Sequence, residues 1–265
     1  MVGPDGVAYG LAHTSGLDEG SEELSQITAI DADGVRAGWP VSIEGVASGP
    51  AFASGGRIVV TVGSYVRRTS RVLVFDRDGE AASASSAELP IATGGLLEFG
   101  VDGPECGLPS PRPPLVAQDG TIFVFSEIDT AVFALDQSLA TRPGWPFEPA
   151  ASLVGRDPRS AGDLPCGSLA LPAIGPDSTL YLPLQARDAT VGGSIVAVGP
   201  DGRVRPGWPV ELTRPGAEFW SVVVGSDGTV YALAVEREAG DTSSASILAI
   251  APDSTVLSAT TIIEP

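Results

Sequence analysis

Residues 171–212 read LPAIGPDSTLYLPLQARDATVGGSIVAVGPDGRVRPGWPVEL, and this stretch decides the fold of the chain. Its apolar runs are rich in Val, Ile and Leu and lie at 172–174, 180–184, 194–198 and 204–212. Between them stand Pro-Asp-Ser at 176–178 and Pro-Asp-Gly at 200–202, which are turn sequences. Short apolar runs bounded by such turns predict strands. The stretch therefore predicts four antiparallel strands in succession.

The same pattern recurs along the chain. The first turn of each copy falls at Gly6, Gly56, Gly120, Ser178 and Gly228, so the spacings are 50, 64, 58 and 50 residues. A period near 50 with additions in the middle fits four-stranded blades that carry loop insertions. Apolar residues do not follow the helical period, and 33 Gly and 23 Pro supply turns. We therefore predict an all-β fold: a β-propeller of about five four-stranded antiparallel blades, or part of a larger propeller.

We expect one propeller domain over residues 1–265. Its blades are predicted at 1–46, 47–90, 112–150, 170–214 and 219–265, with insertions at 91–111 and 151–169. Met1 to Gly6 already match the repeat, so we expect the chain to begin partway through its first strand, without a signal peptide. In 229–234 both alternating sets of side chains are largely apolar, which predicts a strand covered on both faces.

The formal charge is −18, from 33 acidic residues against 15 arginines. This charge repels nucleic-acid phosphates and anionic lipid surfaces, so we expect no nucleic-acid partner. No run approaches the roughly 18 consecutive apolar residues of a membrane-spanning helix, so we expect no membrane insertion. We expect a monomer or part of a longer chain.

The repeated pattern P-A-I-G-x-D-G-T-x-Y, followed by S-x-x-A-I-x-P-D-G and P-G-W-P-V, resembles the PQQ-type (quinoprotein alcohol dehydrogenase-like) β-propeller repeat. The resemblance covers residues 2–263 and implies the propeller fold. The quinone dehydrogenases of this type generally have eight blades, adjacent cysteines in a disulfide ring, and a calcium ion held partly by Asn. This chain has about five copies, separated cysteines and no Asn. The resemblance therefore implies no cofactor and no catalytic residue here.

Three copies carry Gly-Trp-Pro at the same place, with the indoles of Trp39, Trp145 and Trp208. Because the triplet repeats, we interpret these tryptophans as structural side chains that pack between neighbouring blades. Stacking of a sugar on an exposed indole is the alternative.

The residues that differ from copy to copy are candidates for binding. Propeller loops gather around one opening, which suits recognition of a protein or carbohydrate partner. The predicted interaction face consists of Tyr65, Arg67, Arg68, Glu98, Phe99, Glu218, Phe219 and Trp220.

Two cysteines stand at similar places in the two insertions. Cys106 lies 14 residues before Gly120, and Cys166 lies 12 residues before Ser178. Equivalent positions on adjacent blades are close in space, so we predict a disulfide worth about 4 kcal/mol in the chain-entropy model. It would indicate an exported protein, extracellular or periplasmic. Two separate reduced thiols are the alternative.

Catalytic chemistry has little support in the sequence. His13 is the single histidine, so a multi-histidine metal site is excluded and His13 is interpreted as a loop residue. The pairs Asp31/Asp33 and Asp76/Asp78 resemble calcium loops but stop after two carboxylates, so we expect no metal. We predict a non-enzymatic binding or scaffold domain of an exported bacterial protein. The alternatives are a quinone-dependent oxidoreductase, a propeller lyase or an outer-membrane assembly scaffold.

Overall fold

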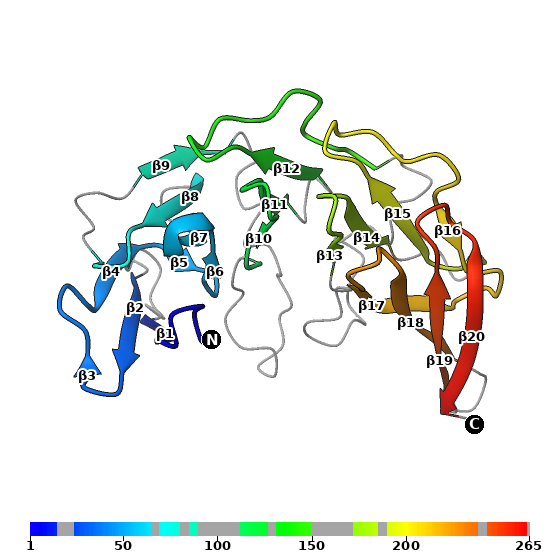
Figure 1. Ribbon diagram of the computed structural model, residues 1–265, viewed down its shortest axis with the longest axis horizontal. Helices are drawn as coiled ribbons and strands as arrows, with labels where there is room; N and C mark the ends of the chain where they lie inside the picture. The colour runs from blue at the N-terminus through cyan, green and yellow to red at the C-terminus, as the bar shows by residue number, and fades with distance from the viewer. Residues whose placement is uncertain are drawn as a thin grey trace. The chain divides into compact units, whose positions relative to one another are not determined.

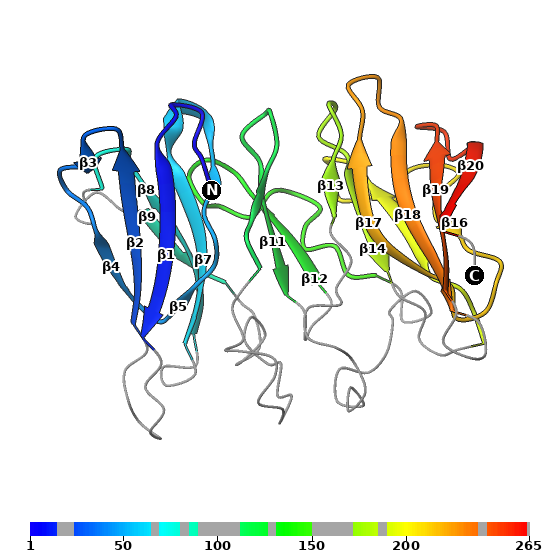
Figure 2. The ribbon, with the colours of Figure 1, turned by 90° about the horizontal axis from the view of Figure 1, so that it is seen from below.

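The computed structural model describes residues 1–14, 24–64, 69–79, 85–89, 112–126, 131–149, 172–184, 190–237 and 243–263. Within these ranges the chain is all β, and antiparallel sheets of the propeller-blade type follow one another along it (Figures 1 and 2). The predicted fold class is confirmed, and the number of blades stays a prediction. Met1–Pro146 and Phe147–Pro265 form two compact units. None of the helical structure in these ranges has the length and apolar character needed to cross a bilayer.

The described residues of the first unit form three sheets. The first is built from β1 (Ala8–Thr14), β2 (Leu24–Asp31), β3 (Gly34–Val35) and β4 (Val41–Glu44). The second is built from β5 (Val46–Ala47), β6 (Ala51–Phe52), β7 (Ile58–Ser64), β8 (Thr69–Phe75) and β9 (Ser85–Glu88), with a 3-10 turn at Ser54–Gly56. The third is built from β10 (Leu115–Val116), β11 (Ile122–Ser126) and β12 (Ala131–Leu135).

In the part of the second unit that the structure describes, there are two four-stranded sheets whose strands are paired in sequence order. One is built from β13 (Ala173–Ile174), β14 (Leu180–Leu184), β15 (Ser194–Val198) and β16 (Val210–Glu211). The other is built from β17 (Glu218–Val224), β18 (Val230–Arg237), β19 (Ser243–Ile250) and β20 (Val256–Ile263).

The four strands predicted in 171–212 are all present, but the last is shorter than expected. It was predicted at 204–212 and forms only at Val210–Glu211, with an isolated bridge from Val204 to Val198. The reason is local: the Trp208 amide donates to the Arg205 carbonyl at 3.2 Å, so the Arg-Pro-Gly-Trp segment forms a turn in place of a ladder.

The repeated first turn closes in the same way in several copies. In the fourth copy the Asp177 carboxylate accepts from the Thr179 amide at 3.2 Å, and the Gly175 amide donates to the Thr179 carbonyl at 2.8 Å. The residue after Asp has positive φ: Gly228 at 84° and Ser178 at 62°. Asp therefore caps the turn and Gly supplies the left-handed backbone that the next strand requires.

Alternation gives each sheet two faces. We name the face toward the sheet that follows in sequence the forward face, and the face toward the sheet that precedes the backward face. In β17–β20 the forward face is the side that bears Tyr231, and in β1–β4 the backward face is the side that bears Ala8. Within the first unit, the β1–β4 forward face packs on the β5–β9 backward face, through Tyr9, Ile27 and Ala29 against Ile58, Val60, Val62 and Phe75. The β5–β9 forward face packs on the third sheet, through Val59, Val72 and Val74 against Ile122, Val124, Phe133 and Leu135. In the second unit the corresponding junction joins Tyr181, Ile195 and Ala197 to Val222, Val230, Ala232, Ala234 and Ile250.

Candidate functional site

Two of the repeated tryptophans, Trp39 and Trp208, are built into junctions between sheets, and Trp145 is 7% exposed with its ring edge-on to Phe123 at 5.3 Å. Trp208 is 6% exposed, and its ring meets Tyr181 edge-on at a centroid distance of 5.3 Å. Its indole Nε1 donates to the Pro252 carbonyl at 3.1 Å, in a turn of the following sheet. Trp39 repeats this arrangement, with its Nε1 donating to the Arg77 carbonyl at 3.3 Å. These positions leave no indole face free for a sugar, in line with the structural interpretation.

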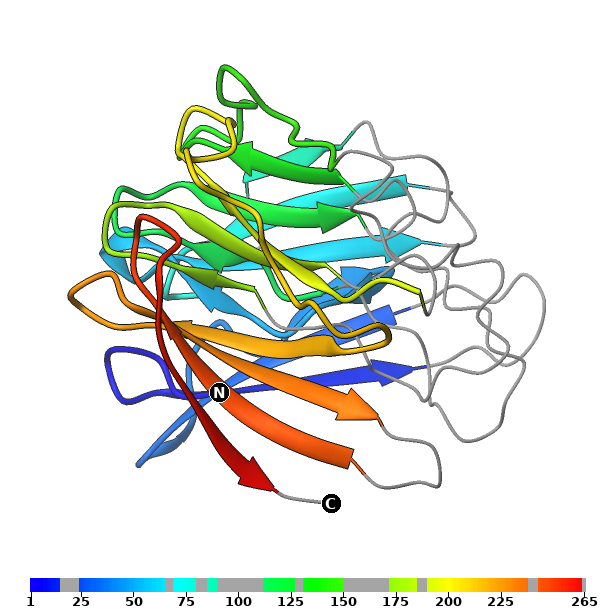
Figure 3. The ribbon, with the colours of Figure 1, turned by 90° about the vertical axis from the view of Figure 1, so that its right-hand side faces the viewer.

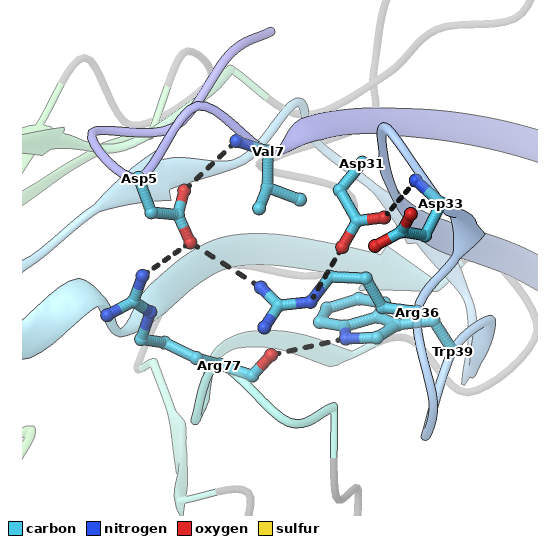
Figure 4. A network of polar contacts seen from close by, with 7 residues as sticks. All are labelled: Asp5, Val7, Asp31, Asp33, Arg36, Trp39 and Arg77. Carbon is cyan, nitrogen blue, oxygen red and sulfur yellow. Dashed lines mark hydrogen bonds and ion pairs between the residues drawn. The ribbon is translucent and has the colours of Figure 1, made fainter.

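Charged side chains gather at the turns of the first two sheets (Figure 4). The Asp5 carboxylate accepts from the Arg77 guanidinium at 2.6 Å and pairs with Arg36 at 3.5 Å. Arg36 also pairs with Asp31 at 3.6 Å. The hydrogen bond from Arg77 lowers the pKa of Asp5 below its ordinary value. The network ties two sheets together, and Asp31 is engaged by arginine.

The same pairing of a turn aspartate with an arginine occurs in two more copies, between Asp119 and Arg142 at 3.0 Å and between Asp177 and Arg205. The signal is readable in sequence, because each of these arginines stands three residues before the Trp of Gly-Trp-Pro. In the part of the chain that the structure describes, no three acidic, His or Cys side chains are grouped as a metal site would require.

A small polar pocket lies over the Asp119 turn. Its volume is about 260 Å³, slightly below the range of roughly 300–1,000 Å³ that is usual for small-molecule sites. Its two carboxylates are satisfied internally: Asp119 pairs with Arg142, and Asp136 accepts from the amides of Ser138 and Ala140 at 2.8 and 3.1 Å. Neither of these two carboxylates is therefore free to act as an acid, a base or a ligand in the pocket.

The single histidine meets a serine. His13 Nδ1 lies 2.9 Å from the Ser25 hydroxyl, and burial lowers the pKa of His13. The Ser25 hydroxyl is fully buried, donates to the Gly45 carbonyl at 2.7 Å, and accepts from the Ala47 amide at 2.8 Å. Because its proton and lone pairs are engaged in holding β5 to the first sheet, Ser25 is a structural residue and not a nucleophile.

Most of the predicted interaction face cannot be placed. Tyr65, Arg67, Arg68, Glu98 and Phe99 lie outside the described residues, as do Cys106 and Cys166. Glu218, Phe219 and Trp220 belong to β17 itself and not to the loop before it.

The three residues of β17 have different environments. Phe219 is 1% exposed in the core between the two sheets, so it packs and does not face a partner. Trp220 is 48% exposed and stands at a register shift between Phe219 and Ser221, which is a β-bulge. Glu218 is partly exposed. Bulges commonly redirect a side chain, and here the bulge brings an indole to the surface.

The sheet that contains Trp220 has an exposed apolar surface, the β17–β20 forward face, and this sheet is turned toward the viewer in Figure 3. Val223, Tyr231 and Ile247 are 62%, 43% and 40% exposed. Register places Val223 opposite Tyr231, and Leu233 opposite Ile247, so these side chains share one face. The sequence predicted cover on both faces of β18; on the forward face this is wrong for Tyr231, whereas Val235 is 7% exposed. Exposed apolar patches of this kind mark interaction sites.

Comparison with models of protein families and with curated proteins gives no match. Similar solved structures include a protein of unknown function from Bacteroides caccae, at 14% identity over 91% of this chain and 77% of that chain, with a TM-score of 0.49. Another is the β-propeller domain of the Trilobed protease from Pyrococcus furiosus, at 12% identity over 94% and 67% of the chains, with a TM-score of 0.49.

A quinoprotein alcohol dehydrogenase-like protein from Bacteroides thetaiotaomicron is similar at 12% identity over 98% of this chain and 67% of that chain, with a TM-score of 0.44. At such identities and scores these likenesses carry no argument about function. The fold assignment rests on the sheets and their junctions.

Proposed function

We propose that this chain is a non-enzymatic binding or scaffold domain that recognises a protein through the β17–β20 forward face. The observation that supports this proposal is the exposure of Val223, Tyr231 and Ile247 on one face of one sheet, which also bears the exposed Trp220 on β17. Burying such a surface against a partner contributes about 25 cal/mol per Å² of apolar area. In the described polar clusters, in contrast, the charged side chains pair with one another and hold turns and sheets together.

A comparative pull-down tests this function. The bait is the chain with Val223→Glu and Tyr231→Glu, compared with wild type and with a control, Val191→Glu, which alters a 49% exposed valine outside the face. We expect a partner from envelope extracts that wild type and the control retain and the double variant loses. A partner set that does not differ among the three baits would contradict the proposal. Retention of quinone absorbance after incubation with PQQ and calcium and desalting would favour the oxidoreductase alternative.

We also propose that the repeat is of the PQQ type without quinone chemistry, and that the chain is exported to the periplasm or the cell exterior. The repeated Gly-Trp-Pro supports the first point, and the matched cysteines Cys106 and Cys166 support the second. Intact mass with and without reductant, after alkylation, tests the predicted disulfide. Two alkylated thiols in native material would reject it.

A further inference from the structure

The junction between the β13–β16 and β17–β20 sheets shows which residues of a forward face contact the next sheet. Tyr181 and Ala197 are opposite each other in the β14–β15 ladder, and Ile195 lies on the same face. These three side chains are 4%, 0% and 0% exposed, because the β17–β20 backward face covers them. The covering residues are small or branched and comprise Val222, Val230, Ala232, Ala234 and Ile250.

The first unit uses the same residues in the same register. Tyr9 is opposite Ala29, and Ile27 lies on the same face, as Tyr181, Ala197 and Ile195 do in the second unit. The β5–β9 sheet, which has no Gly-Trp-Pro, also buries its forward face, with Val59 at 0% exposure. A forward face therefore binds a backward face whether or not a Trp seals the junction.

The β17–β20 forward face carries the same set of side chains, exposed at Tyr231 and Ile247, whereas Val235 and Ala245 on the same face are each 7% exposed. Tyr231 is opposite Ala249, and Ile247 lies on the same face, so the set Tyr, Ala and Ile recurs in identical register. Tyr231 and Ile247 are 43% and 40% exposed, against 4% and 0% for Tyr181 and Ile195. The ladder positions on this face, in β17 to β20, extend it with the uncharged Val223, Leu233, Ser258 and Thr260, and a carboxylate, Glu218, lies opposite Val235.

The complementary surface is the β1–β4 backward face. The first strand of this sheet corresponds to β18 of the last sheet, because Ala8 and Val230 each stand two residues after the glycine of the first turn. Gly10 and Ala12 then correspond to Ala232 and Ala234. Ala8, Gly10 and Ala12 are all exposed. Ile30, opposite Ala8, is 44% exposed, and Val35, opposite Ile30, is 57% exposed. The small residues leave room for a tyrosine ring. The same face also carries polar Thr28, Gln26 and Ser42, and the carboxylate Glu44 opposite Leu24.

We propose that the β17–β20 forward face of one copy of this chain binds the β1–β4 backward face of a second copy. This inference rests on the proposed binding function and names the partner at that face. Because the two surfaces differ, the contact is heterologous and repeats from copy to copy, giving rings or open chains. Each copy carries −18, so screening the mutual repulsion with salt strengthens the association, which relies on apolar contact.

Sedimentation of the full chain over a range of concentrations, in low and high salt, tests the proposal. We expect assemblies larger than a monomer, and we expect their fraction to increase with protein concentration and with salt concentration. Tyr231→Glu places a carboxylate on the forward face, and Gly10→Glu places one on the backward face. Each variant weakens association by about 100-fold or more, because the carboxylate would be buried in the contact without a partner. A Cβ at Gly10 meets no atom within 4 Å, so this variant has room to fold. Ile30→Glu is the second variant for that face, and Val191→Glu is the control.

Mixing the two single-face variants decides between modes of association. Each variant keeps one intact face, so an equimolar mixture forms a 1:1 dimer while each alone is monomeric. A wild type that stays monomeric at its highest soluble concentration in high salt overturns the proposal, as does a Gly10→Glu variant that assembles like wild type. If the wild type is monomeric and the variant with Val223→Glu and Tyr231→Glu still loses a partner in the pull-down, the binding function stands and self-association is rejected.

Discussion

Replacing Trp208 tests whether the Gly-Trp-Pro segment holds adjacent sheets together. The side chain is 6% exposed, contacts Tyr181 edge-on at 5.3 Å and donates to the Pro252 carbonyl at 3.1 Å. Truncation removes a large apolar side chain from a packed junction, and Trp→Ala changes at such sites cost about 3–5 kcal/mol. Trp208→Phe keeps an aromatic ring but loses the hydrogen bond, for which we expect about 1–2 kcal/mol.

Urea unfolding followed by circular dichroism measures both variants, with Trp220→Ala as the matched control because Trp220 is 48% exposed. The control should change the free energy of unfolding by no more than about 0.5 kcal/mol. Dilute protein keeps any self-association out of the measurement. Equal losses for Trp208→Ala and Trp220→Ala, or a Trp208→Phe variant as unstable as Trp208→Ala, would refute the reasoning.

Three further predictions concern turns and ion pairs. The lowered pKa of Asp5, caused first by the Arg77 hydrogen bond, contributes stability that is present above the ordinary pKa of 3.8 and lost as pH falls below it. Asp5→Asn should therefore lose less stability than wild type between pH 5 and pH 2.5 in urea midpoints, and an equal loss contradicts this. Ser254 has φ 75°, so Ser254→Gly should raise the unfolding free energy by about 0.5–1 kcal/mol, and a decrease refutes the strain. Gly38 has φ 83° and a Cβ would collide with the Asp78 carbonyl, so Gly38→Ala should cost more than about 2 kcal/mol, unlike the unobstructed Gly10→Ala.

Local chemistry accounts for the part of the fold that was predictable. Turn residues at 176–178 and 200–202 and the alternation between them act over a few neighbouring residues, so strands and hairpins could be read directly. The repetition of Gly-Trp-Pro likewise indicated a structural role, because a site unique to one partner has no reason to recur. The shortened β16 was missed because Val204 to Trp208 contain apolar residues that a turn uses.

The candidate site depended on contacts that alternation cannot report. Phe219 and Trp220 are adjacent aromatic residues, and only the bulge in β17 sends one into the core and the other to the surface. Tyr231 and Tyr181 stand in the same local pattern, yet one is exposed and the other buried, because a following sheet covers only Tyr181. The sequence by itself determined the all-β repeat, its turns and its junction residues. Tertiary structure decided which faces are covered, since burial depends on the sheet that packs across a face and not on the strand that bears it.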